Sequence, residues 1–209
     1  MRLDREHLDQ RDKYFKTNLI NAITGFKSAN LVGTVSPSGQ TNLAVISSVV
    51  HVGAMPPLNA MVIRPHSTPR HSLENLIATG FYTLNHIHRD MVASAHQTSA
   101  RYPREQSEFA ATGLDEYWLE GFAAPFVGQS RIRLGMRYRE HQTLAINGTV
   151  LVIGEVVLVD VPDDCVADTG HLDLERAGTV AVNGLDGYHT TRQLARMAYA
   201  KPGQDAVRQ

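Results

Sequence analysis

This chain has a single cysteine, no long apolar run and almost no net charge. Cys165 is the only cysteine in 209 residues, which excludes an internal disulfide and favours a reducing compartment. No run approaches the roughly 20 apolar residues that a membrane-spanning helix needs, and the charged start MRLDREHLDQ lacks the apolar core of a secretory signal. A formal net charge of -1 gives no long-range attraction to nucleic acid or an anionic membrane. We therefore expect a cytoplasmic protein that binds neither nucleic acid nor membrane.

Several catalytic signatures are missing as well. The chain contains no GxSxG nucleophile elbow, no HExxH metal motif and no GxGxxG dinucleotide fingerprint. His86 and His88 share one face of an expected strand, but no Cys/His pair has zinc spacing, so we predict no metal site. Cys165 lies in VPDDCVAD, where nearby carboxylates raise a thiol pKa and make it a poor nucleophile. The catalytic residues are therefore unknown from motifs alone.

What the chain does contain is a series of apolar, β-branched segments. The pattern predicts strands at 30–35, 42–52, 58–64, 81–87, 130–139 and 150–161, and helices at 12–25, 72–79, 90–100 and, briefly, 190–199. Asn147-Gly148 is a hairpin signal, and strand signals fade after Pro162. Because helices do not alternate with strands, we expect a mainly β fold with added helices, a barrel or sandwich rather than a doubly wound sheet. No linker divides residues 1–209, so one domain is expected.

The strongest local signal is the segment IRPHSTPRHSLENL, which enters the second expected helix. Its hydrogen-bond donors are Arg64, Ser67, Thr68, Arg70, His71 and Ser72. Arginine pairs bidentately with phosphate, and a helix N-terminus adds free N–H groups and a favourable dipole. The segment is thus suited to hold a phosphate group. The alternative is an ordinary helix capped by Ser72, with solvated arginines.

Polar residues interrupt the expected strand 42–52. Asn42, Ser47 and Ser48 stand among apolar neighbours, and each needs a hydrogen-bond partner if it is buried. They either bond the backbone or face the edge of a heteroaromatic ligand. In the second case Val49 and Val50 would pack against the ring. Together with the phosphate segment, this pattern indicates a nucleotide-type cofactor.

The order of these segments resembles the flavin reductase-like family. The resemblance covers about residues 28–200 and rests on the blocks SANLVGTVSPSGQTNLAVISSV, PPLNAMVIRP, RHSLENLIATGFYTLN, RYREHQTL and VLVIGEVVLVDVPDD. It implies a six-stranded Greek-key split barrel, the FMN-binding split barrel of the flavoredoxin-type members. It also implies a homodimer with FMN bound near the subunit interface.

The resemblance assigns roles to particular residues. Segment 42–50 would touch the isoalloxazine ring, and segment 64–72 would hold the phosphate. Asn85 matches a position near the cofactor, and Tyr188 or His189 would approach the flavin or the nicotinamide. At the helix start the family often has Lys-Asp-Thr, where this chain has Arg-His-Ser. The Gly-Asp-His motif of short-chain members is absent.

The function that the resemblance implies is an FMN-dependent oxidoreductase, namely an NAD(P)H:flavin reductase. A hydride from NADH or NADPH would pass to flavin N5, and the electrons would pass on to a second acceptor, such as a monooxygenase or other redox partner. Two alternatives stay open. One is an FMN-binding electron carrier without reductase activity, and the other is a pyridoxamine-phosphate-oxidase-like enzyme that acts on an amine.

Overall fold

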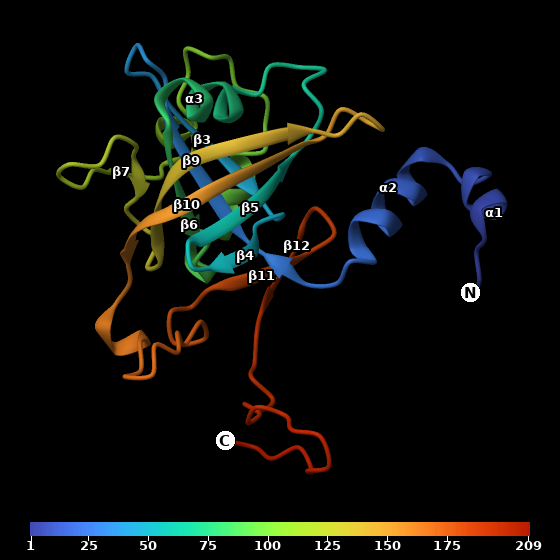
Figure 1. Ribbon diagram of the computed structural model, residues 1–209. Coiled ribbons are helices and arrows are strands. Elements are labelled where there is room, and N and C mark those ends of the chain that lie inside the picture. Colours follow the sequence, from blue (N-terminus) through green and yellow to red (C-terminus); the bar gives the residue numbers. More distant parts are fainter.

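The computed structural model describes residues 1–209 and is built mainly from β-strands (Figure 1). Its helices are α1 (Arg5–Asp9), α2 (Lys13–Ala22), α3 (His71–Thr79), α4 (Val92–Gln97) and α5 (Glu108–Thr112), with 3₁₀ turns η1 (Arg89–Met91) and η2 (Asp163–Cys165). Its strands are β1 (Lys27–Ser28), β2 (Asn30–Val35), β3 (Thr41–Ile46), β4 (Val50–Ala54), β5 (Pro57–Ile63), β6 (Phe81–His86), β7 (Glu116–Tyr117), β8 (Phe126–Val127), β9 (Arg133–Thr143), β10 (Val150–Asp160), β11 (Val180–Asn183) and β12 (Gly187–Thr190).

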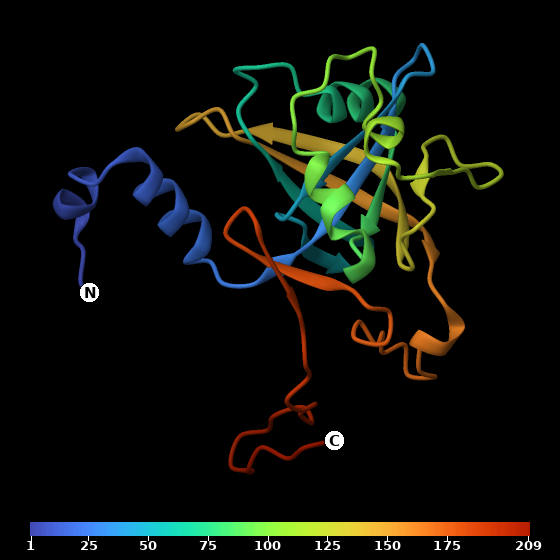
Figure 2. The same cartoon turned by 180° about the vertical axis from the view of Figure 1, so that it is seen from behind.

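Seven of the strands form one antiparallel sheet in the order β3-β2-β6-β9-β10-β5-β4. A second sheet has the order β1-β11-β12. The two views place α3 at one end of the large sheet and β11 and β12 at the other (Figures 1 and 2). Helices α4 and α5 contact β3 and appear in green on the face that Figure 2 shows. The consecutive strands β3 and β4 are therefore the two open edges of the sheet.

The core divides into two clusters because β2 is buried on both faces. Leu31 belongs to a cluster with Leu43 of β3, whereas its neighbour Val32 packs with Leu76 and Tyr82. Successive side chains of a strand point to opposite faces, so β2 separates the two clusters. This burial explains why apolar and polar residues do not alternate along β2, whose residues Asn30–Thr34 are all buried.

Helix α3 follows from its local sequence. Leu73 and Leu76 lie on one face of the helix and pack into the second cluster. Gly80 ends the helix in the left-handed conformation, with φ of 78°, which glycine adopts without strain. The predicted helix 72–79 is confirmed to within one residue at its start.

The prediction of one long strand over 42–52 is wrong. The segment forms two strands, β3 and β4, which are separated by residues Ser47–Val49 and lie at opposite edges of the large sheet. We call residues 47–49 the β3–β4 link. Val45 and Ile46 before the two serines and Val49 and Val50 after them are all β-branched, so periodicity alone does not reveal the break.

Three further expectations need correction. Residues 190–199 form no helix, and β11 and β12 arise in the region where strand signals fade. The large sheet has seven strands, one more than the six expected.

Both chain ends extend away from the barrel, the N-terminal end as α1 and α2 and the C-terminal end as segment 191–209 (Figure 1). Among the helices, none combines the length and apolar character that crossing a membrane requires.

Candidate functional site

The start of α3 presents unused hydrogen-bond donors. Its N-cap residue, Arg70, makes no side-chain cap bond, and the backbone N–H groups of His71, Ser72 and Leu73 donate to no acceptor. A helix N-terminus also carries partial positive charge from the aligned peptide dipoles. This end of α3 can therefore bind an anion through three backbone donors.

The loop before α3 adds two arginines with different environments. The Arg70 guanidinium donates through Nε and Nη2 to the carbonyl oxygen of Pro65, each at 3.3 Å. It thus braces the loop and keeps Nη1 free. Arg64 is exposed, as are Ser67 and Thr68 in the same loop. The structure brings all of these predicted donors into the loop that enters α3.

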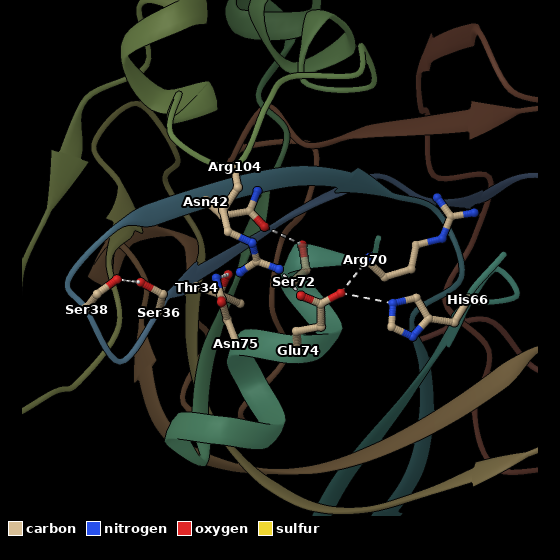
Figure 3. Close-up of polar contacts among 10 residues, drawn as sticks. All are labelled: Thr34, Ser36, Ser38, Asn42, His66, Arg70, Ser72, Glu74, Asn75 and Arg104. Carbon is tan, nitrogen blue, oxygen red and sulfur yellow. Dashed lines mark hydrogen bonds and ion pairs between the residues drawn. The ribbon is translucent and has the colours of Figure 1, made fainter. Parts of the chain in front are cut away.

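The Glu74 carboxylate, in the first turn of α3, contacts three residues (Figure 3). Its Oε1 accepts the backbone N–H of Arg70 at 3.2 Å and lies 2.9 Å from His66 Nε2. Its Oε2 forms an ion pair with Arg104. Sequence reasoning missed Arg104 because it lies 30 residues away along the chain, where no local pattern links it to α3.

His71 is the first residue of α3 and is partly buried. Burial lowers its pKa below the usual 6.5, and the positive charge of Arg104 lowers it further. The carboxylates of Glu108 and Glu105 act in the opposite direction. A lowered pKa favours the neutral imidazole near pH 7, which still offers one N–H donor.

Asn42 and Ser72 meet although they come from different elements. The Ser72 hydroxyl donates to Asn42 Oδ1 at 3.1 Å, and Asn42 Nδ2 donates to Glu108 Oε2 at 2.6 Å. The Asn42 side chain is thereby fixed between α3 and α5. Both predicted residues stand at the start of α3, at the phosphate end of the predicted site rather than at its ring end.

The β3–β4 link contains the remaining polar residues of this segment. The Ser48 hydroxyl donates to the Val62 carbonyl at 2.8 Å and accepts the Val62 N–H at 3.1 Å. Of the two roles expected for it, Ser48 therefore bonds the backbone, and these two hydrogen bonds attach the link to β5. Ser47 makes no side-chain hydrogen bond, Val49 is half-buried and Val50 is exposed. Ser47, Val49 and Val50 are the members of this group left available to a ring.

Asn85 is fully buried. Its Nδ2 donates to the Leu31 carbonyl at 3.2 Å and to Thr83 Oγ1 at 2.8 Å, while its Oδ1 accepts the Val127 N–H at 3.0 Å. The side chain ties β2, β6 and β8 together. It has no surface open to a ligand, so its role in this structure is to hold the fold.

Tyr188 and His189 point in opposite directions because they are consecutive residues of β12. The Tyr188 hydroxyl lies 3.2 Å from His96 Nδ1, and its ring packs against the core cluster that contains Leu31 and Leu43. Burial raises the pKa of Tyr188. The His189 ring instead meets Phe26 edge-on, with centroids 4.8 Å apart. Of the two, Tyr188 faces this core cluster and α4.

Comparison with known protein families shows which family this chain belongs to. Residues 24–183 match the family model described as the flavin reductase like domain. The chain belongs to this family. The sequence resemblance is thereby confirmed over most of the chain, and with it a flavin reductase-type enzyme.

Several solved structures are similar to this flavin reductase-like protein. A candidate flavin reductase with a split barrel domain from Shewanella frigidimarina NCIMB 400 is 50% identical, with a TM-score of 0.93 over 96% of this chain and 100% of the other. Nitrilotriacetate monooxygenase component B from Bacillus cereus is 20% identical, with a TM-score of 0.81 over 92% and 96%. Flavoredoxin of Desulfovibrio vulgaris (Miyazaki F) is 21% identical, with a TM-score of 0.70 over 85% and 91%. The split-barrel fold is confirmed.

Proposed function

We propose that this enzyme binds FMN, with the phosphate at the start of α3 and the ring along the β3–β4 link. The main support is the set of unused backbone donors at His71, Ser72 and Leu73. Neighbouring guanidinium and hydroxyl groups match the chemistry of a phosphate. The donor set therefore fits the phosphate end of FMN. Ser47, Val49 and Val50 of the predicted ring site are exposed or half-buried, and so accessible to a ring.

The reaction we propose is the oxidation of NADH or NADPH, with transfer of the electrons to a second acceptor. Bound FMN would supply the hydride-accepting chemistry, and the protein would supply binding and orientation. No acid or base among the side chains is required for a hydride transfer of this kind. This explains why the chain lacks the hydrolase and metalloenzyme motifs.

The proposal of FMN and a redox partner is supported by names among the structural relatives. An FMN-binding protein from Thermus thermophilus is 16% identical with a TM-score of 0.65, and one relative is the B component of a monooxygenase. At such identities the likeness itself concerns the fold. We propose by analogy that FMN is the cofactor and that a monooxygenase or similar protein receives the electrons.

We further propose that the chain acts as one cytoplasmic domain that forms a homodimer. The extended chain ends carry exposed apolar side chains: Tyr14 and Ile23 in the N-terminal part, Leu194 and Tyr199 in the C-terminal part. Apolar groups in this number favour burial against another surface. A second copy of the chain is the partner that a symmetric dimer would offer.

The decisive experiment is a flavin titration followed by anaerobic reduction. The purified protein is titrated with FMN by fluorescence quenching, and NADH or NADPH is then added without oxygen. We expect micromolar or tighter binding and loss of the oxidised-flavin absorbance. Persistent yellow colour with both nicotinamides would favour the electron carrier instead. Absence of FMN binding would overturn the cofactor assignment itself.

A further inference from the structure

Arg104 reaches the start of α3 from the segment that joins α4 to α5. Figure 3 shows its guanidinium beside Ser72 and Glu74, below the Asn42 side chain. Its charge is also felt by His71, whose pKa it lowers. Arg104 therefore stands next to the unused backbone donors of α3, although it belongs to none of the sequence segments that suggest a phosphate site.

The Arg104 side chain has donors to spare. A guanidinium carries five N–H donors in a rigid fork, and Arg104 uses only Nη2, in its ion pair with Glu74. Its side chain is 45% exposed, so the remaining donors are accessible. Arg70, by contrast, spends two donor atoms on the Pro65 carbonyl. Arg104 is the better placed of the two to grip an incoming phosphate.

Glu74 accounts for the fixed position of Arg104. A lone carboxylate at this point would repel a phosphate, but Glu74 is neutralised by Arg104 and contacts His66. An ion pair of this type restricts a long, flexible side chain before any ligand arrives. The guanidinium is therefore oriented in advance, at the cost of one of its donors.

We propose that Arg104 is the specificity-determining residue that makes the site prefer a phosphate-bearing flavin over riboflavin, and that Glu74 is its positioning residue. This inference rests on the proposed function, since it requires that FMN binds at α3. It assigns the phosphate selectivity to the α4–α5 segment in addition to the loop 64–70. The ligand class is a flavin mononucleotide carrying a phosphate dianion.

The test compares dissociation constants for FMN and riboflavin, measured by fluorescence quenching on the full chain. Both flavins share the ring, so their ratio isolates the phosphate. We expect Arg104→Ala to weaken FMN binding roughly 10- to 100-fold, the range for a lost charge-assisted hydrogen bond, with riboflavin binding unchanged. Arg104→Lys should restore part of the preference, because it keeps the charge but loses the fork. Glu74→Gln should reduce the preference by a smaller factor.

Arg101→Ala is the matched control, because Arg101 is exposed and its side chain makes no hydrogen bond or ion pair. We expect it to leave both constants unchanged. If the wild type prefers FMN and Arg104→Ala keeps that preference, the inference fails and the proposed function stands. An equal loss for both flavins would also overturn it, because Arg104 would then support the fold. If the wild type binds FMN no better than riboflavin, the phosphate site itself is refuted.

Discussion

The Glu108 carboxylate accepts the Asn42 side-chain amide at 2.6 Å and the Leu43 backbone N–H at 2.9 Å, both through Oε2. Glu108 is only 7% exposed and is the first residue of α5. Because Asn42 in turn accepts the Ser72 hydroxyl, a continuous hydrogen-bond chain runs from α5 through β3 to the start of α3. The position of Ser72 thus depends on a carboxylate in a separate helix.

Glu108→Gln tests this chain. The substitution keeps the size of the side chain but removes the charge from an acceptor that serves two donors. We expect the free energy of unfolding to fall by about 1–3 kcal/mol, and FMN binding to weaken because Asn42 and Ser72 lose their fixed geometry. Urea denaturation and flavin titration measure the two effects. Glu120→Gln is the control, since Glu120 is exposed and its side chain makes no hydrogen bond; equal behaviour of the two variants would contradict the role of Glu108.

Substitutions of the two loop arginines test the phosphate site directly. Arg64→Ala and Arg70→Ala should each weaken FMN binding by about 1–3 kcal/mol if the contacts are charge-assisted. Arg70→Ala should also loosen the loop, since it releases the Pro65 carbonyl, and proteolysis within 64–70 should then be faster. Isothermal titration with FMN is the measurement. Unchanged affinity in both variants would remove these arginines from the site.

The elements that can be predicted from the sequence are those that depend on residues close to one another along the chain. The helix at α3 follows from Leu73 and Leu76 at helical spacing and from Gly80 at its end. Its donor-rich N-terminal loop lies within the same stretch of sequence. The family resemblance supplied the split barrel, which neither composition nor periodicity specifies.

The features that sequence reasoning missed depend on contacts between distant residues. The break at the β3–β4 link is stabilised by Ser48, which bonds Val62 14 residues further on. Strand β11 forms against β1, which lies more than 150 residues earlier in the chain, through pairs such as Lys27 with Val182. Arg104 meets Glu74 across 30 residues. None of these pairings leaves a pattern within a short window, so only the tertiary structure reveals them.

Gly33 of β2 is a position where even a methyl group does not fit. A Cβ atom there would lie 2.3 Å from the Pro125 carbonyl oxygen and 2.5 Å from Thr83 Oγ1. The carbonyl belongs to the backbone and itself accepts the Thr83 hydroxyl at 2.7 Å. Neither atom can therefore move aside without a large cost in free energy. We expect Gly33→Ala to destabilise the protein by about 3 kcal/mol, the upper end of overpacking costs.

The matched control for Gly33 is Gly53, another strand glycine without a positive φ. The nearest atom to its Cβ position is the Pro56 carbonyl oxygen at 3.4 Å, an ordinary contact. We expect Gly53→Ala to change the free energy of unfolding by less than about 1 kcal/mol. Chemical denaturation of both variants provides the comparison. A tolerated Gly33→Ala would mean that segment 124–127 does not pack against β2 as described.

Acid sensitivity of the fold should depend on His86, at the end of β6. Burial lowers its pKa from 6.5 to about 4, and its Nδ1 lies 3.4 Å from Thr179 Oγ1. Between pH 6.5 and about 4 the unfolded chain therefore binds a proton that the folded chain resists. Stability from this residue is fully present above pH 6.5 and declines as the pH falls, by about 3 kcal/mol in total.

His86→Asn removes this titration while keeping a polar side chain beside Thr179. We expect the variant to be less stable than the wild type at pH 7.5, because packing is lost, yet to lose less stability between pH 6.5 and pH 4.5. Urea denaturation across this range gives both slopes. His51→Asn is the control, because His51 is exposed and its replacement should leave the wild-type slope intact. Parallel pH dependence in the wild type and in His86→Asn would show that other groups govern acid unfolding, since the slope of stability against pH reports only protons bound differently by the two states.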